Sequence, residues 1–215
     1  MKSNSIIRRP FRYTFCNMAL IIIGINIAVY ILLKMNPRLI SYLALNVVNV
    51  VRGHMYWQFF TYMFVHDISS LQHILFNMLG LLFFGVTTEK AIGSKEFLLL
   101  YLLSGIFCGI VSFVIYYFSG ANYVFLYGAS GALYTILLAY AVIYPRAKIF
   151  IWGIVPVPAP LLIAAYAGIE IASQLLNMNS GVAHMTHLAG FAFARIYFYV
   201  RMGINPWKVW KSAYR

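Results

Sequence analysis

The stretch YGASGALYTILLAYAVIY, residues 127–144, decides the fold that the sequence predicts. Its apolar residues favour a helix at about 131–144, preceded by Ser130. At about 1.5 Å per residue this helix is roughly 21 Å long, whereas the hydrocarbon core of a bilayer is about 30 Å thick. In a membrane its N-terminal end would therefore lie at a depth of roughly 9 Å. Such a start is tolerated only where protein buries it or it lines a water-filled cavity.

The rest of the chain has the composition of a membrane protein. Of its 215 residues, 63% are hydrophobic and 9% are charged, and the mean hydropathy is +0.82. Soluble domains carry roughly a quarter charged residues, so a soluble globular fold is excluded. The apolar runs predict an all-α, polytopic membrane protein with six transmembrane helices, at 17–33, 70–88, 95–118, 131–144, 159–176 and 182–200. They form one domain, 17–200, between an N-terminal segment, 1–16, and a juxtamembrane tail, 201–215.

The basic residues predict how the chain is oriented. There are 16 Lys and Arg against four acids, a net charge of +12. The basic residues lie outside or between the apolar runs and not in one stripe, so we expect no nucleic-acid partner. They gather before the first predicted helix and after the second, fourth and sixth. The positive-inside rule therefore places both termini in the cytoplasm. A compact chain of this kind favours a bacterial plasma membrane, and an organelle membrane stays open.

Two connections differ from simple loops. The external loop at about 34–69 contains WQFFTYMF, residues 57–64, an amphipathic aromatic stretch suited to the bilayer interface. We expect this loop to be partly inserted in the membrane. After the fourth helix, Pro156, Pro158 and Pro160 forbid a continuous helix, which predicts an interfacial turn leading into the fifth.

Polar side chains inside the predicted spans are candidates for a functional site, because burying them in lipid is costly. His73 and Asn77 lie four residues apart on one face of the second helix, and His187 lies near the start of the sixth. Their estimated depths are roughly 5, 10 and 8 Å, close to that of Ser130. The unpaired N–H groups at a helix start carry partial positive charge and suit an oxyanion. This environment indicates that Ser130 is a nucleophile.

These residues resemble the motifs of the rhomboid intramembrane serine proteases. The motifs are HILFN (73–77), GASG (128–131) and HLAG (187–190), in the family's order and on the second, fourth and sixth helices. The resemblance extends over about 57–199. It implies a six-transmembrane-helix rhomboid bundle with a membrane-inserted first external loop, and it requires no metal or organic cofactor. The expected partners are transmembrane protein substrates and membrane lipids.

The resemblance also implies a role for each motif residue. Ser130 is the nucleophile and His187 the general base of an endopeptidase that cleaves transmembrane segments near the outer face through an acyl-enzyme. His73, Asn77 and the Ser130 backbone N–H stabilise the oxyanion. The supporting positions are Gly128 and Gly131, which permit a tight turn and close helix approach, Tyr134, which matches an aromatic packed on the imidazole, and Gly190, which lets the fourth and sixth helices approach.

Two further polar residues of the predicted spans, His184 and Glu170, need an assignment beside the general base. His184 competes with His187, but the family's spacing to Gly190 selects His187, so we expect His184 to line the cavity or bond a loop. Glu170, in the fifth helix, is either neutral and hydrogen-bonded or hydrates the cavity. Because acids are few and no motif places Glu170 beside His187, the sequence favours a Ser130–His187 dyad over a triad.

The loops carry smaller predictions. His66, helped by Asp67, is expected to organise the loop before the second helix. Gln58 stands where the family frequently has an arginine, so any role of that arginine in positioning the loop is expected to be absent here. The helix at 159–176 and the NMNSG loop, 177–181, are predicted to act as substrate gate and lid.

Two other classes of function remain as alternatives. A catalytically inactive rhomboid-like scaffold would bind transmembrane clients, but such proteins typically lose the serine or histidine kept here. A metal-dependent membrane protein would use His66, His73, His184 and His187, but the last pair lacks an HExxH glutamate.

Overall fold

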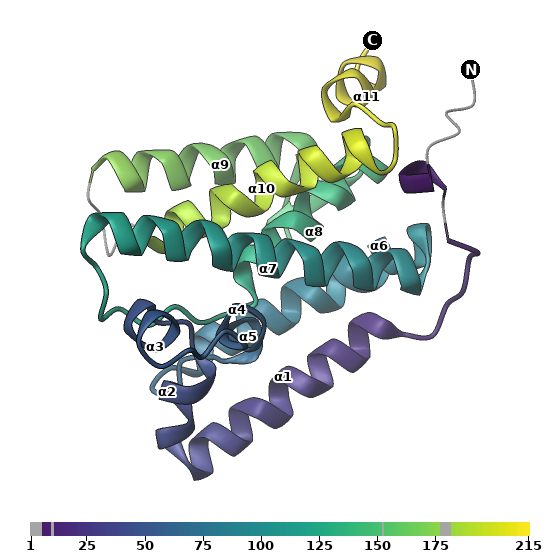
Figure 1. Cartoon of the computed structure of the whole chain (residues 1–215). Coiled ribbons are helices and arrows are strands. Elements are labelled where there is room, and N and C mark those ends of the chain that lie inside the picture. Colours follow the sequence, from purple (N-terminus) through teal and green to yellow (C-terminus); the bar gives the residue numbers. More distant parts are fainter. Residues whose placement is uncertain (1–5, 10, 152, 177–181) are drawn as a thin grey trace.

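The structure is a computed structural model that describes residues 6–9, 11–151, 153–176 and 182–215. All six predicted helices are present (Figure 1). They are α1 (Met18–Met35), the continuous run of α5 (Leu71–Gly80), the π turn η4 (Leu81–Gly85) and α6 (Val86–Ile92), then α7 (Ser94–Ser119), α8 (Ser130–Ile143), α9 (Ala159–Leu175) and α10 (Val182–Val200). The predicted ends differ from these by four residues or fewer.

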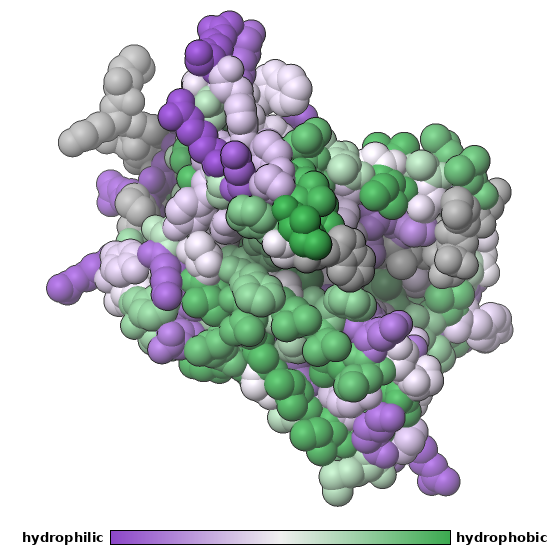
Figure 2. Space-filling model, turned by 180° about the vertical axis from the view of Figure 1, so that it is seen from behind, coloured by the Kyte–Doolittle hydropathy of each residue, from purple (hydrophilic) through white to green (hydrophobic). Residues whose placement is uncertain are grey.

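The helices have the length and surface of a membrane bundle, which confirms the predicted fold class. Within the described residues, Met18–Met35, Leu71–Ile92 and Ser94–Ser119 are long and apolar enough to cross a membrane, and α8 and α9 are shorter apolar helices. Figure 2 shows apolar side chains over a broad band of one face, with hydrophilic ones gathered toward its margins. The chain is therefore an integral membrane protein.

Helix α8 lies inside the bundle, where α5, α6, α7, α9 and α10 pack around it. Ten of its 14 residues are buried. Small residues at its start, among them Gly131 and Ala132, allow neighbouring helices to approach closely. A helix of this length is roughly 21 Å long, as the sequence predicts. Ser130, at its N-terminal end, is therefore held by protein on several sides.

The first loop folds into short helices at one end of the bundle (Figure 1). These are η2 (Pro37–Leu39), α2 (Ile40–Leu43), α3 (Val47–Val51), α4 (Gln58–Thr61) and η3 (Tyr62–Phe64). The buried Gln58 side chain accepts a hydrogen bond from the Asn46 N–H at 3.1 Å and donates one to the Ser41 carbonyl at 2.9 Å. Gln58 thus ties two parts of the first loop together.

The segment between α8 and α9 differs from the predicted turn. It forms an antiparallel hairpin of β1 (Lys148–Ile151) and β2 (Val155–Pro158), with Lys148 opposite Pro158. Because each strand of a two-stranded sheet is an edge, prolines at 156 and 158 remain compatible with pairing. After α10, the tail forms α11 (Pro206–Ala213), where Trp210 Nε1 donates to the Ala141 carbonyl at 2.9 Å.

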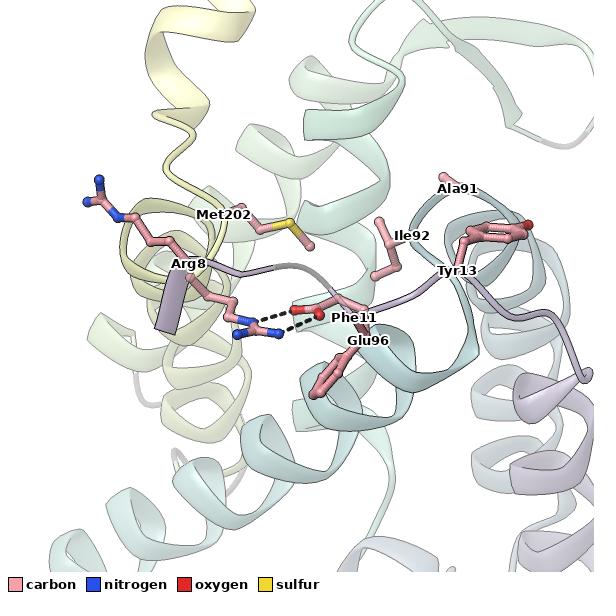
Figure 3. Close-up of a pocket in the computed structure, with 8 residues that line it drawn as sticks. Arg8, Phe11, Tyr13, Ala91, Ile92, Glu96 and Met202 are labelled. Atoms are coloured by element: carbon pink, nitrogen blue, oxygen red, sulfur yellow. Dashed lines mark hydrogen bonds and ion pairs between the residues drawn. The ribbon is translucent and has the colours of Figure 1, made fainter. Parts of the chain in front are cut away.

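The end of the bundle that carries α11 is held by two buried glutamates. Glu89 accepts from the N–H groups of Met18 at 2.7 Å and Ala19 at 2.9 Å, and so caps α1. Glu96, near the start of α7, pairs with Arg201 through two bonds of 2.9 Å. A cavity of about 380 Å³ lies beside Glu96 (Figure 3), lined also by Arg8, Phe11, Tyr13, Ala91, Ile92, Arg201 and Met202.

Candidate active site

The backbone before α8 is tied to the first loop, which fixes the position of Ser130. Leu45 and Leu126 exchange backbone hydrogen bonds of 2.9 and 2.8 Å, and the Gly128 N–H donates to the Tyr62 carbonyl at 3.1 Å. Gly128 has a φ of +128°, a conformation that residues with a Cβ rarely adopt. The chain therefore turns sharply into α8, with Ser130 as the first helical residue.

His187 reaches Ser130 because α8 and α10 approach closely. An ideal Cβ on Gly190 would lie only 2.3 Å from the Gly131 carbonyl oxygen. Thr135 Oγ1 donates to the Gly190 carbonyl at 2.7 Å, a further link between the two helices. At this crossing His187 Nε2 lies 2.9 Å from Ser130 Oγ. A serine hydroxyl and an imidazole nitrogen at this distance form the pair that nucleophilic catalysis requires.

Tyr134 covers one face of the His187 imidazole. The two rings are stacked, with centroids 4.1 Å apart and planes 9° from parallel. Tyr134 lies one turn after Ser130 on α8, so the same helix carries the hydroxyl and the aromatic platform. The stacking limits rotation of the imidazole about the bond that joins it to α10.

Glu170, on α9, contacts the imidazole of His187. This contact corrects the expectation of a Ser130–His187 dyad without a carboxylate beside it. Glu170 Oε1 lies 2.8 Å from His187 Nδ1 and also accepts the Tyr134 hydroxyl. Its second oxygen, Oε2, is bonded to His184 Nδ1. His184 thus binds a neighbouring helix, where a cavity or loop contact was expected. The Glu170 side chain is buried, with the residue only 6% exposed.

The sequence contained a signal for this contact that motif matching misses. Residue 170 lies six positions before the predicted end of the fifth helix at 176, and residue 187 lies five positions after the predicted start of the sixth at 182. Helices joined by a short loop pack antiparallel, so these two positions fall at one level. A carboxylate within a span also needs hydrogen-bond donors nearby, and His187 is one of them.

His73 lines the same cavities as Ser130. Its Nδ1 accepts the Asp67 N–H at 3.4 Å, which leaves Nε2 to carry a proton and act as a donor. The Cβ position of Gly128 lies 3.0 Å from His73 Nε2 and 3.7 Å from Ser130 Oγ, so a side chain at Gly128 would occupy the space between them. Asn77 is buried, and its Nδ2 donates to the His73 carbonyl at 2.8 Å.

Two cavities adjoin Ser130. One, of about 410 Å³, includes Asn77, Phe76 and Tyr134 together with His73 and Ser130. The other, of about 300 Å³, includes His73, Ser130 and His187, along with residues of the loop before α8. The four residues that the sequence placed at one depth are thus gathered around adjoining cavities. Their catalytic roles remain proposals.

His66 and Asp67 are arranged differently from the prediction. His66 is fully buried, with its ring centroid 5.1 Å from that of His73, and its burial lowers its pKa to about 4. The Asp67 carboxylate accepts bonds from the backbone and hydroxyl of Ser69, at 2.8 and 2.6 Å. Those bonds lower the pKa of Asp67. Asp67 therefore supports His73 through its backbone N–H. Its carboxylate bonds Ser69, whereas the sequence predicts that Asp67 helps His66.

Two further expectations concern the lid and the metal alternative. The NMNSG segment, 177–181, lies outside the described residues. Throughout the part of the chain that the structure describes, there is no group of three His, Cys, Asp or Glu side chains that could hold a metal ion.

Comparison with known proteins identifies similar chains. The family model described as the rhomboid domain matches residues 53–203. RHOMBOID-like protein 12, mitochondrial, from Arabidopsis thaliana is 33% identical over 141 residues, which are 59% of this chain and 41% of that protein. Rhomboid protease GlpG from Klebsiella pneumoniae is 36% identical over 81 residues, 38% of this chain and 26% of that protein. The matched regions span less than half the length of these relatives.

Proposed function

Because the chain belongs to the rhomboid family, we propose that it is an intramembrane serine endopeptidase with Ser130 as nucleophile and His187 as general base. The observation that carries this proposal is the 2.9 Å contact between Ser130 Oγ and His187 Nε2 at a helix N-terminus inside the bundle. The Klebsiella relative is named a rhomboid protease, which supports the same activity.

The proposed reaction follows from this geometry. His187 Nε2 takes the Ser130 proton as Oγ attacks the scissile carbonyl, and a tetrahedral intermediate forms. The imidazolium then gives the proton to the leaving amine, which leaves an acyl-enzyme on Ser130. A water molecule, activated by the same imidazole, attacks the ester and releases the second product. The two cavities that adjoin Ser130 provide space for substrate and water.

We assign oxyanion stabilisation to groups on the opposite side of Ser130 from His187. The N–H of Ser130 belongs to the first turn of α8, whose N–H groups lack helical partners. His73 Nε2 supplies a second donor, and the second hydrogen of Asn77 Nδ2 supplies a third. Fixed donors of this kind stabilise a developing negative charge without having to reorganise.

The substrates we propose are transmembrane segments of membrane-anchored proteins. A helical segment hides its peptide carbonyls in hydrogen bonds, so cleavage requires local unwinding, which small or helix-breaking residues favour. We also propose that cleavage occurs near the outer face, with both chain termini in the cytoplasm of a bacterium. The distribution of basic residues supports this orientation, while the similarity to a mitochondrial protein keeps an organelle as the alternative membrane.

The test is cleavage of a reporter transmembrane segment by the purified chain in liposomes, followed by gel mobility. Ser130→Ala and His187→Ala should each abolish cleavage, and a fluorophosphonate probe should label the wild type but not Ser130→Ala. Ser104→Ala is a matched control, because Ser104 is buried and donates to the Tyr101 carbonyl of its own helix, at 2.8 Å. Cleavage by Ser130→Ala would refute the nucleophile. Binding of the segment by a wild type that neither cleaves nor reacts with the probe would indicate the inactive scaffold.

A further inference from the structure

We infer that Glu170 is a positioning residue for the proposed reaction: its carboxylate holds the His187 imidazole with Nε2 directed at Ser130, so that the site works as a Ser130–His187–Glu170 triad. The inference rests on the proposed function. It goes beyond it, because the three motifs of the resemblance contain no acidic residue.

Both nitrogens of the His187 ring are engaged, one on each side. Nε2 lies 2.9 Å from Ser130 Oγ, and Nδ1 lies 2.8 Å from Glu170 Oε1. An ionised carboxylate only accepts hydrogen bonds, so the proton of the neutral ring must sit on Nδ1. Nε2 is then left with the lone pair that takes the serine proton. The contact therefore selects the tautomer that general-base catalysis needs.

The carboxylate is itself held in place by donors from two helices. Tyr134, on α8, donates to Oε1, and His184, on α10, is bonded to Oε2. With the residue 6% exposed, Glu170 depends on such partners, because a buried carboxylate without donors is costly. Its position is thus determined by α8 and α10 together, which are the helices that carry Ser130 and His187.

The same contact stabilises the charge that forms during the reaction. When His187 takes the serine proton, its ring becomes positive beside the negative Glu170, and the attraction favours this state in a poorly solvated site. The proton on Nδ1 stays on the imidazole. Among the described residues, the other ionisable groups around the pair include His184 on α10, Tyr134 on α8, Tyr166 on α9 and His73 on α5. The hydroxyl-bearing residues Tyr62, Tyr116 and Tyr127 line the same cavity as Ser130 and His187.

The test compares Glu170→Gln with the wild type in the reporter assay and in the rate of fluorophosphonate labelling. The amide keeps the size of the side chain but removes its charge and can offer an N–H to Nδ1, which favours the wrong tautomer. We expect kcat to fall by about 10²- to 10⁴-fold with KM changed by less than about 3-fold. We also expect the acid limb of the pH–rate profile to move to lower pH, because the neutral amide no longer attracts the imidazolium. Glu170→Asp should restore part of kcat and of the profile.

The matched control is Glu96→Gln. Glu96 is also buried and also accepts a tyrosine hydroxyl, that of Tyr197, but it lies at the end of the bundle that carries α11. Its variant should keep the wild-type pH profile. Wild-type kcat and an unmoved acid limb in Glu170→Gln would overturn the inference. With Ser130→Ala inactive, that result would leave the proposed function standing, whereas activity in Ser130→Ala would remove both.

A second variant covers the case in which Glu170→Gln does not fold. Tyr134→Phe keeps the stacked ring but removes one donor to Oε1, which leaves the imidazole as the main donor to that oxygen. The carboxylate then attracts the imidazolium more strongly, and the acid limb should move to higher pH. An unmoved acid limb in Tyr134→Phe would contradict the triad.

Discussion

Gly190→Ala places a methyl group against the backbone beside the proposed nucleophile. An ideal Cβ at Gly190 lies 2.3 Å from the Gly131 carbonyl oxygen and 3.2 Å from Tyr134 Cβ. A carbon normally approaches a carbonyl oxygen to about 3.3 Å. Because the obstacle is backbone and not a flexible side chain, α8 and α10 must separate locally by roughly 1 Å.

That separation acts on both stability and activity. Overpacking of a close contact typically costs about 1–3 kcal/mol. The hydrogen bond from Thr135 to the Gly190 carbonyl, 2.7 Å long, lies at the same crossing and would be stretched. So would the 2.9 Å contact between Ser130 and His187. A displacement of about 1 Å in a catalytic pair can lower the rate by roughly 10²-fold.

The measurement combines thermal unfolding in detergent with the rate of fluorophosphonate labelling. We expect Gly190→Ala to unfold at a lower temperature and to label about 10²-fold more slowly under conditions where it remains folded. Gly24→Ala is the control, since a Cβ on Gly24, in α1, would meet no atom within 4 Å. Unchanged stability and labelling in Gly190→Ala would show that α8 and α10 are not in the close contact described, and would refute the reasoning.

Two further predictions concern buried groups away from the reacting atoms. Glu89→Ala leaves the N–H groups of Met18 and Ala19 without their carboxylate acceptor and should destabilise the fold by about 2 kcal/mol or more in detergent unfolding, with Glu89→Asp less affected. Burial lowers the pKa of His66 from its ordinary value of 6.5 to about 4, so the unfolded chain binds a proton first as pH falls. His66 should therefore cost stability between about pH 6.5 and pH 4, on the order of 3 kcal/mol, and His66→Gln should unfold with a shallower pH dependence. Parallel profiles of unfolding temperature against pH in wild type and variant would contradict this.

The helices and the residues around Ser130 could be predicted because their signals are local. Each helix is a long apolar run, and the short run after Ser130 shows by its length alone that its start lies inside the bundle. The spacing that identifies His73 and Asn77 lies within the second predicted helix. The spacing of His187 to Gly190 lies within the sixth. These arguments need no knowledge of which helices touch. The hairpin at 148–158 was missed because its prolines were interpreted as breaks, whereas an edge strand accepts them.

The buried glutamates could not be predicted in the same way, because their partners lie far along the chain. Glu89 binds the start of α1, about 70 residues earlier, and Glu96 binds Arg201, more than 100 residues later. Local sequence places these residues at or beside the connection between the second and third predicted helices, and it does not show what they contact. Only the packing of the helices brings each carboxylate to its donors.

The same reasoning explains why scarcity of acids was a poor guide to the site. A buried carboxylate is tolerated where donors would otherwise be unsatisfied, so its presence in an apolar span indicates donors at its level. Glu89 meets helix N–H groups, Glu96 meets a guanidinium and a tyrosine, and Glu170 meets two imidazoles and a tyrosine. This chain has only four acidic residues, so an acid inside a span is strong evidence that hydrogen-bond donors lie near it. The three groups that contact Glu170 include His187, whose Nε2 faces Ser130 Oγ. A carboxylate bonded to Nδ1 of that ring has the geometry of a triad, which favours the proposed positioning role over a purely structural one.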